Sequence, residues 1–505
     1  MAVISTNPAT GVTRELEFEE TSEAQVTEVC RSAAEVAGEF SSLPLERRAQ
    51  MLNNMANELD ADATTLVSNA DEETALGQAR LQGELRRTTF QLRFFADVVT
   101  EGTFLNASID HAGDSPMGPL PDLRRMKIPI GVVGVFGSSN FPFAFSVPGG
   151  DTASALAAGC PVVIKAHPAH PTTSAATFQA LERGALKSGA PKGTVNLVYG
   201  MAAGIALVES NYVDAIGFTG SVAAGRSLWQ RANARTTPIP FYGELGSANP
   251  LVVTEVAAKE RAVEIGTGFA GSMTLGAGQF CTKPGLLFVP TGVAGDELVE
   301  AVVETLRSRG TFVMLSEGVA NSFHLNTQSM RSSKMVRALV DDEMQERFLT
   351  SAHLFEIGAD DFSGPDADAL HQECFGPAAV VIRYSSKEQL RTAVLSTEKS
   401  LTFSVFCGEN DSDEEWLLHV GAQRAGRVIV NGFPTGVGVS WSMQHGGPWP
   451  STTSSSATSV GTASIERWLR PVTFQSVPER VLPLALRDTN PLGLLRRVDG
   501  VQAFG

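Results

Sequence analysis

The pattern of hydrophobic and polar positions divides the chain into a helical N-terminal part and two later parts in which strands and helices alternate. Residues 22–100 consist of long runs of Ala, Leu, Glu, Gln and Arg with few glycines, broken near Pro44, which predicts consecutive helices. From Lys127 onward, short β-rich runs alternate with alanine-rich segments of helical length. The strand candidates are IGVVGVFG, PVVIKA, TVNLVYG and DAIGFTGS. This alternation predicts βαβ units and a parallel, doubly wound sheet.

A second alternating block begins at Leu286, and its strand candidates are LLFVP, AAVVIRY, FSVFC and GRVIVN. We therefore expect an α/β protein with two doubly wound domains that meet near Glu244–Asn249. The basic tract LRRMK, 123–127, is interpreted as a solvated strand edge, and the cluster STTSSSATS, 451–459, as a flexible polar loop.

Composition narrows the functional classes. The chain has 505 residues, 43% of them hydrophobic and 19% charged, which is typical of a globular protein of about two to four domains. A net charge of −16 argues against nucleic acid and anionic membranes as partners. The start, MAVISTNPATGV, does not have the pattern of a signal peptide, and the apolar stretch from Ile128 is too short to span a bilayer. Five scattered cysteines indicate free thiols in a reducing compartment, so we expect a cytoplasmic protein.

Three residues are candidates for chemistry. Cys281 lies among glycines in LGAGQFCTKPG, where its sulfur can be accessible, although most single cysteines are small buried hydrophobes. Glu244 follows an apolar run in IPFYGELGSANP, so we expect a raised pKa that suits a general base, the alternative being a capping or salt-bridged acid. Asn140 ends a strand at a Gly/Ser turn, where its amide can stabilise an oxyanion or simply form the turn.

Two segments have features of phosphate binding. Lys165 ends the strand in PVVIKAHP, and AIGFTGSVAAGR places Gly220, Ser221 and Gly225 between a strand and a helix, where backbone N–H groups can bind a pyrophosphate. We reject a metal site at His167 and His170, because prolines make that segment an extended loop; the expected metal content is none.

In order and spacing, these segments resemble the aldehyde dehydrogenase superfamily over nearly the whole chain. The matching elements are NPATG at 7–11, N-F-P at 140–142, the cofactor lysine at 165, F-T-G-S at 218–221, E-L-G at 244–246, Q-x-C at 279–281 and E-x-F-G-P at 373–377. The resemblance implies the aldehyde dehydrogenase fold: two doubly wound α/β domains and a small β oligomerisation arm. The implied division is 1–245 for the cofactor-binding domain, interrupted by the arm segment 116–129; 246–440 for the catalytic domain; and 441–505 for a return to the first domain with a C-terminal oligomerisation strand.

The resemblance also implies residue roles. Cys281 would be the nucleophile, Glu244 the base that activates the hydrolytic water, and Asn140 a partner of the Cys281 backbone N–H in the oxyanion hole. The implied cofactor contacts are Lys165 and His167 at the adenosine ribose, Gly220, Ser221 and Gly225 at the pyrophosphate turn, Gly246 nearby, Glu373 at the nicotinamide ribose and Phe375 beside the ring. The implied product is a carboxylate, formed through a thioester.

A narrower resemblance, carried by GELGSANP, GAGQFCTKPG, KAHPAHP and HGGPWPSTT, is to the branch with α-ketoglutaric semialdehyde (2,5-dioxopentanoate) dehydrogenases and NADP-linked long-chain aldehyde dehydrogenases. NADP is favoured, with NAD possible, because Pro168 stands where many NAD-preferring relatives have a glutamate. The segment after the cysteine, Thr282-Lys283-Pro284, and the tract 454–456, which lacks the Asp and Arg expected there, depart from the usual pattern. The implied substrate residues are Phe141, Phe145, Ser146, Phe280 and Thr282.

We favour α-ketoglutaric semialdehyde as substrate, with its distal 2-oxo-carboxylate bound by the hydroxyls of Ser146, Thr282 and 451–456 rather than by a buried arginine. The alternatives are a fatty or broad-specificity aldehyde dehydrogenase, a coenzyme-A-acylating enzyme, which commonly lacks the glutamate, and a non-enzymatic binding protein. In the family, the region of 116–129 pairs with a C-terminal strand, here RPVTFQSVP at Arg470–Pro478, so a homodimer or homotetramer is expected.

Overall fold

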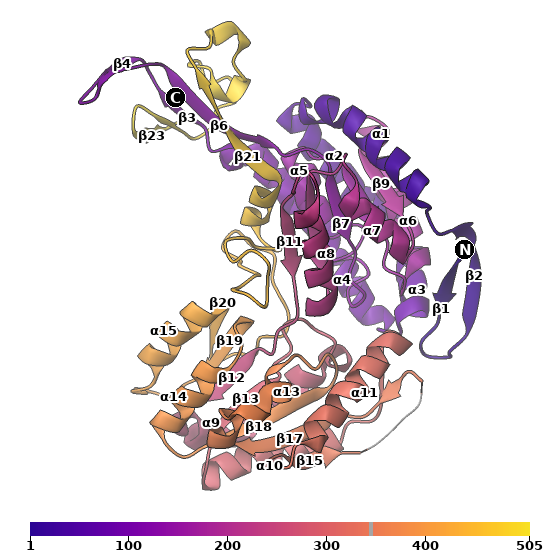
Figure 1. The fold of residues 1–505 in the computed structure, drawn as a ribbon, viewed down its shortest axis with the longest axis vertical. Coiled ribbons are helices and arrows are strands. Elements are labelled where there is room, and N and C mark those ends of the chain that lie inside the picture. Colours follow the sequence, from indigo (N-terminus) through magenta and orange to yellow (C-terminus); the bar gives the residue numbers. More distant parts are fainter. Residues whose placement is uncertain (343–346, 505) are drawn as a thin grey trace.

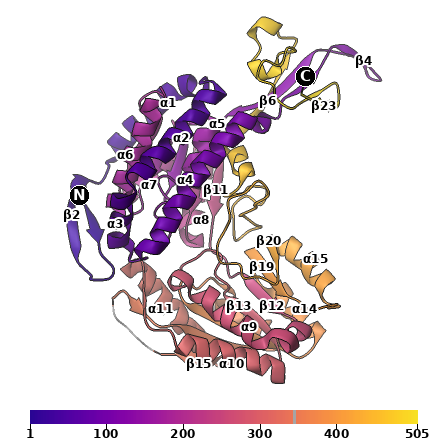
Figure 2. The same cartoon turned by 180° about the vertical axis from the view of Figure 1, so that it is seen from behind.

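The computed structural model describes residues 1–342 and 347–504 and contains two α/β domains and a projecting β arm (Figure 1). The N-terminal helices form where the sequence predicts them. Ser22 begins the first one with a capping box to Gln25, and Pro44 precedes the second. The second and fourth helices pack over one face of the first sheet (Figure 2), whereas the first contributes Val26, Cys30 and Ala33 to the core on the opposite face. Their bounds are α1 Glu23–Ser41, α2 Leu45–Ala61, α3 Ala63–Thr74 and α4 Gln78–Glu101. A hairpin of β1 Ala2–Thr6 and β2 Thr13–Glu19 precedes them.

The first sheet is parallel, in the order β11-β10-β7-β8-β9. The order in which the chain adds strands reverses between β7 and β10, because β8 and β9 follow on one side and β10 and β11 on the other. Ligands of doubly wound sheets bind at the carboxyl ends of the strands beside such a switch point. The strands are β7 Val133–Phe136, β8 Val162–Lys165, β9 Val195–Val198, β10 Ala215–Thr219 and β11 Phe241–Glu244. The helices are α5 Gly150–Ala158, α6 Pro171–Lys187, α7 Met201–Glu209 and α8 Val222–Ala234.

The second sheet has the order β15-β17-β18-β13-β12-β19-β20 and is parallel except for the edge strand β15. Its strands are β12 Pro250–Val253, β13 Leu286–Pro290, β15 Arg337–Asp341, β17 His353–Gly358, β18 Ala378–Tyr384, β19 Ser400–Phe406 and β20 Ala425–Val430. Its helices are α9 Glu255–Thr274, α10 Val293–Arg307, α11 Glu317–Ser332, α12 Ala359–Phe362, α13 Asp368–His371, α14 Lys387–Ser396 and α15 Glu414–Arg424, with a short ribbon of β14 Phe312–Val313 and β16 Leu349–Thr350. The chain passes from the first sheet to the second between β11 and β12, near the expected seam; the exact domain division stays a prediction.

The arm is a separate sheet in the order β21-β6-β3-β22-β23. As expected, the C-terminal strand pairs antiparallel with the segment before Pro129, since Leu469 lies opposite Pro129 and Gln475 opposite Leu123. The bounds are β3 Ser108–Asp110, β6 Leu123–Pro129, β21 Leu469–Gln475, β22 Arg496–Val498 and β23 Val501–Ala503, with a terminal hairpin of β4 Gly113–Ser115 and β5 Gly118–Leu120.

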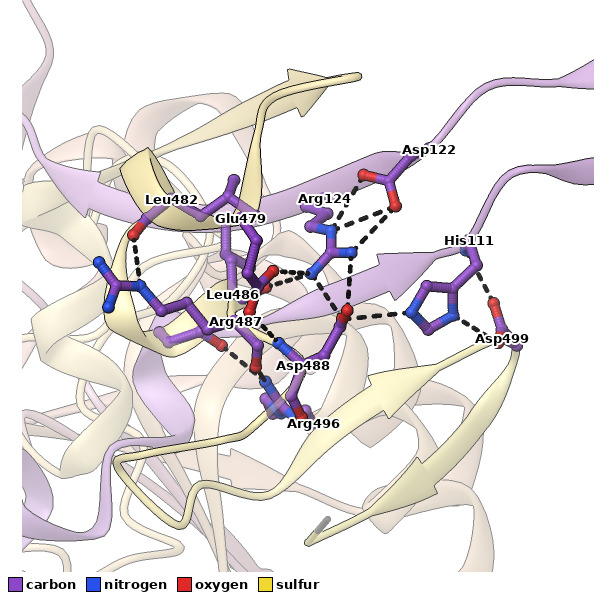
Figure 3. A network of polar contacts seen from close by, with 11 residues as sticks. His111, Asp122, Arg124, Glu479, Leu482, Leu486, Arg487, Asp488, Arg496 and Asp499 are labelled. Atoms are coloured by element: carbon purple, nitrogen blue, oxygen red, sulfur yellow. Dashed lines mark hydrogen bonds and ion pairs between the residues drawn. The ribbon is translucent and has the colours of Figure 1, made fainter.

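The interpretation of 123–127 as a solvated strand edge is wrong, because β6 lies between β21 and β3. Arg124 is only 5% exposed, and its guanidinium contacts Asp122 at 2.9 Å and Asp488 at 2.6 Å (Figure 3). His111 bridges Asp488 and Asp499 in the same network. These ion pairs tie the C-terminal segment, which the sequence pattern did not assign to the sheet, onto the arm.

The Ser/Thr cluster is also more ordered than composition suggests. Thr452 forms an antiparallel bridge with Glu244, and the Thr453 hydroxyl accepts from the Gly243 N–H at 2.8 Å and donates to the Phe241 carbonyl at 2.7 Å. The start of the cluster therefore extends the edge of the first sheet at β11 and is not a flexible loop. No helix in the described ranges is both long and apolar enough to cross a membrane.

Candidate functional site

A cavity of about 580 Å³ opens at the carboxyl ends of β7, β8, β10 and β11, and residues of both domains line it. It brings together most of the residues singled out from the sequence: Asn140, Lys165, His167, Gly220, Ser221, Glu244, Gly246, Cys281, Glu373 and Phe375. Gly225 lies behind this lining. A Cβ there would come within 2.2 Å of the Leu245 side chain, so this glycine lets α8 pack closely against the sheet.

The loop that carries Cys281 is fixed by its neighbours. Gly278 has φ +65°, and a Cβ there would lie 2.3 Å from the Gly376 backbone, so a glycine is needed where these two loops meet. The buried Asn249 amide donates to the carbonyl of Cys281 at 2.7 Å and to that of Lys283 at 3.0 Å. The Lys283 ammonium donates to two backbone carbonyls of the E-x-F-G-P region, at 2.8 and 2.7 Å. The unusual lysine after the cysteine is therefore a buried tie between two loops of the site.

His445 completes a cluster with Cys281 and Glu244 that sequence reasoning missed. Its Nε2 lies 2.9 Å from Oε1 of Glu244 and 3.5 Å from Sγ of Cys281. The second carboxylate oxygen of Glu244 accepts a hydrogen bond from Ser459. Both His445 and Glu244 are buried, at 1% and 4% exposure, whereas Cys281 is partly exposed. The other cysteines are buried.

The expectation that Glu244 has a raised pKa is wrong. Burial does act in that direction, but the charge and hydrogen bond of His445, together with the Ser459 hydroxyl, hold the pKa of Glu244 below its ordinary value. The sequence showed the apolar neighbours of the acid and not its partners. The opposite holds for Cys281: burial first, and then the negative charge of Glu244, raise the pKa of its thiol well above the ordinary value. The resting nucleophile is therefore a thiol, and its sulfur lies 3.5 Å from the His445–Glu244 pair.

Asn140 faces the nucleophile loop. Its Nδ2 donates to the carbonyl of Gln279 at 3.0 Å, which leaves a second amide hydrogen on the same nitrogen. Arg80 holds the Asn140 carbonyl from behind at 2.8 Å. The amide is thus fixed next to the sulfur, in a place where it can donate to an oxygen that becomes negative on a carbonyl attacked by Cys281.

The aromatic side chains that were expected to contact the substrate lie close together, and Phe280 immediately precedes Cys281. The ring of Phe141 lies edge-on to Phe280 at 5.0 Å and to Phe145 at 5.3 Å between centroids. Two arginines of α4 cover this group: Arg80 lies 4.9 Å from the Phe280 centroid and Arg87 5.2 Å from the Phe145 centroid. In each, the Nη1 atom is buried and has no hydrogen-bond partner among the described residues. Both arginines are only partly buried, and they make the surroundings of this aromatic group more polar than the expected apolar funnel.

The hydroxyl groups that were predicted to contact the substrate differ in whether they already have hydrogen-bond partners. Ser146 is 2% exposed, and its hydroxyl has no partner in the described part of the chain. Thr282 is 1% exposed and accepts from the Gly436 N–H at 3.3 Å. Ser451 is fully buried and donates to the Pro448 carbonyl. The hydroxyls of Thr282 and Ser451 are therefore already engaged in holding loops.

On the opposite side of the cavity, the predicted cofactor contacts have unusual electrostatics. Burial lowers the pKa of Lys165 to about 8 and that of His167 well below its ordinary value. Nδ1 of His167 accepts from the Ala169 N–H at 3.1 Å, so this neutral ring carries its proton on Nε2. Ser221 caps α8 and places that helix N-terminus at the cavity wall. Burial raises the pKa of Glu373 to about 7.

Comparison with known proteins agrees with this geometry. The aldehyde dehydrogenase family matches residues 2–319. Alpha-ketoglutaric semialdehyde dehydrogenase 2 of Azospirillum brasilense is 42% identical over 487 residues, covering 95% of this chain and 92% of that protein. Alpha-ketoglutaric semialdehyde dehydrogenase of Acinetobacter baylyi is 39% identical over 481 residues, 94% of this chain and 91% of that protein.

Among solved structures, the NADP-dependent glyceraldehyde-3-phosphate dehydrogenase of Bacillus halodurans, complexed with NADP, superposes with a TM-score of 0.79 at 21% identity. The match covers 94% of this chain and 96% of that one, and it confirms the expected α/β fold with two domains and an arm. The chain therefore belongs to the aldehyde dehydrogenase family and is an oxidoreductase that acts on aldehydes.

Proposed function

We propose that this enzyme oxidises α-ketoglutaric semialdehyde (2,5-dioxopentanoate) to 2-oxoglutarate, with NADP as the preferred cofactor and Cys281 as the nucleophile. The two relatives described above, similar over more than nine-tenths of the chain, carry that substrate in their names. The observation that carries the proposal is the Cys281–His445–Glu244 cluster, which lies between a dinucleotide-sized cavity and an aromatic group covered by arginines.

Acylation begins with removal of the thiol proton. Because burial and Glu244 hold Cys281 in its protonated form, a base must act as the sulfur attacks the aldehyde carbon. Nε2–H of His445 donates to the Glu244 carboxylate at 2.9 Å and lies 3.5 Å from the sulfur, so the thiol proton passes to this hydrogen-bonded pair, ends on Glu244 and leaves from there to solvent, with the imidazole neutral. The remaining hydrogen of the Asn140 amide then donates to the new oxyanion.

Hydrolysis uses the same pair of residues. A nicotinamide held by the residues of the cavity would supply the hydride acceptor needed to oxidise the tetrahedral adduct on Cys281 to a thioester. Glu244 then accepts a proton from the water that cleaves this thioester, with its carboxylate oriented by Ser459 and His445. The presence of a buried carboxylate at this point favours hydrolysis over transfer to coenzyme A.

The residues present fit a nicotinamide dinucleotide. A Cβ at Gly220 would lie 2.7 Å from the ring of Phe218, so the turn before α8 needs glycine, and the α8 N-terminus offers N–H groups to a pyrophosphate. Lys165 and the Nε2–H of His167 are the donors we assign to the adenosine ribose and its 2′-phosphate. Pro168 leaves no carboxylate to repel that phosphate.

Arg87 supports the keto-acid substrate over a fatty aldehyde. Its Nε and Nη2 contact the Val437 carbonyl at 3.3 Å, and its buried Nη1 remains without a partner among the described residues. Burial lowers the pKa of Arg87, and the negative charges of Glu84 and Glu244 oppose that shift. An anionic substrate tail passing Phe145 gives this charge a partner, whereas an alkyl chain leaves it unpaired.

The test is the kcat/KM of Arg87→Leu for 2,5-dioxopentanoate and for pentanal. Loss of one charge-assisted bond should lower the first roughly 10- to 100-fold and leave the second nearly unchanged. Arg86→Leu, a change at the exposed neighbouring position of the same helix, is the matched control. An equal fall in kcat/KM for both substrates would show that Arg87 only supports the 434–437 loop. A wild-type preference for decanal would favour the fatty-aldehyde alternative.

We also propose that the enzyme is a cytoplasmic homodimer or homotetramer. The free cysteines suit a reducing compartment. The arm projects from the two domains (Figure 1), and exposed strand edges of this kind are commonly covered by a partner subunit. Light scattering at micromolar concentration tests this: a monomer contradicts it.

A further inference from the structure

Glu244, Cys281 and His445 each offer an atom with metal-binding capacity, and these atoms all lie within 4.8 Å of one another. The residues come from three separate places: the end of β11, the nucleophile loop and the segment after β20. Sγ lies 3.5 Å from Nε2, and Nε2 lies 2.9 Å from Oε1. Thiolate, imidazole and carboxylate are the ligand types that zinc prefers.

The spacing is close to that of a zinc site. With Zn–S of about 2.3 Å and Zn–N and Zn–O of about 2.0–2.1 Å, the edges of a tetrahedron measure about 3.3–3.6 Å. The Sγ–Nε2 distance already has this length, and the Nε2–Oε1 distance needs to lengthen by a few tenths of an ångström, which a side-chain rotation provides. Glu244 and Cys281 both line the large cavity, through which an ion can reach the three side chains.

Charge and surroundings also suit a divalent cation. A thiolate and a carboxylate together neutralise its two charges, so the buried site carries no net charge. Ser459 orients the free oxygen of Glu244. Nδ1 of His445 is buried and has no partner among the described residues, and His445 is one of the residues that line a cavity of about 20 Å³, with Thr458, Ser459 and Arg467. That volume holds one water, which can accept from the Nδ1–H that a metal-bound imidazole must carry.

We propose that Glu244, Cys281 and His445 bind a zinc ion, which reversibly blocks the nucleophile and so makes the enzyme zinc-sensitive. Binding exchanges the thiol proton for the metal: the S–H bond breaks, the proton goes to solvent, the S–Zn bond forms, and no electron is transferred. Because binding releases a proton, the apparent zinc affinity should rise with pH. This metal site lies beyond the proposed substrate, since its formation requires no aldehyde.

The experiment measures alkylation of Cys281 by iodoacetamide in the chelator-treated full chain, with and without zinc, together with the charge-transfer absorbance of added Co²⁺. In the wild type, zinc should slow alkylation and displace Co²⁺. His445→Gln should weaken both effects by more than the roughly 10- to 100-fold that loss of a mere supporting residue costs. Glu244→Gln, which keeps the side-chain size, serves as an independent second variant, and Cys407→Ser as a control for binding at another thiol.

Two results overturn the site. Either zinc does not protect Cys281 in the wild type, or it protects the His445 and Glu244 variants as strongly as the wild type, which means that the thiol alone binds the metal. Neither readout uses substrate or cofactor, so a failure of the proposed aldehyde specificity leaves both unchanged.

Discussion

Replacing Glu244 by Gln separates the two half-reactions, because the two residues have the same size and only one is a base. In the variant the amide oxygen can accept from only one of His445 and Ser459, the amide NH2 must donate to the other, and His445 still faces the sulfur at 3.5 Å. We therefore expect a burst of about one reduced cofactor per site. Steady turnover then falls roughly 10²–10⁴-fold, which corresponds to about 3–5 kcal/mol in the barrier to thioester hydrolysis.

The same variant has a second signature in its pH dependence. The negative charge of Glu244 is one of the causes that raise the pKa of Cys281, so removing it makes the thiolate easier to form. The pH at half-maximal alkylation of Cys281 should fall in Glu244→Gln and stay unchanged in Glu46→Gln, a change in the exposed first turn of α2. Stopped-flow absorbance and alkylation rates give the two readings. Steady turnover near the wild-type value refutes the assigned role, and a lost burst shows that Glu244 is needed before acylation.

Two further results follow from other charges in the structure. The pKa of Lys165 is lowered to about 8, so its ammonium is lost as pH rises through that value, and the affinity for NADP should fall there. In Lys165→Ala the Kd for NADP should be higher and should no longer show this pH dependence. The control variant Lys187→Ala should match the wild type. Arg124→Leu leaves Asp122 and Asp488 without their shared cation and should destabilise the arm by about 1–3 kcal/mol. The expected results are a lower unfolding midpoint and a shift toward monomer in light scattering. An unchanged midpoint contradicts the importance given to this ion network.

The strands and helices were largely predictable because their signals are local. Alternating β-rich and alanine-rich runs located the strands of both sheets, and the glycine turn before α8 located the cavity wall. The arm pairing between β6 and β21 followed from the family resemblance. The C-terminal strands β22 and β23 were missed, since Arg496–Val498 is too short and too basic to have a strand pattern, and its place depends on pairing with β3.

The site was predictable only as far as its residues lie in local motifs. His445 is 201 positions from Glu244 and 164 from Cys281, in a stretch of glycines and prolines without periodicity. An H-G-G sequence was the available signal, and it does not identify a partner. Arg87 was missed for the opposite reason: it lies in a regular helix, where an arginine normally faces solvent, and only packing of α4 against the aromatic side chains buries it.

The distribution of charge explains how an acidic protein can serve anionic ligands. A net charge of −16 opposes any anion at long range, but exposed charges are screened over about 8 Å at physiological ionic strength, while buried ones are not. The cations assigned to ligands are therefore the shielded ones, the buried Lys165 at the cofactor end and the partly buried Arg87 at the substrate end, each with its pKa lowered by loss of water. A bound anion stabilises the charged form of both side chains and so offsets the destabilisation that loss of water causes. Selectivity for anionic substrates then comes from contact within the site, and it should persist at salt concentrations that abolish long-range attraction.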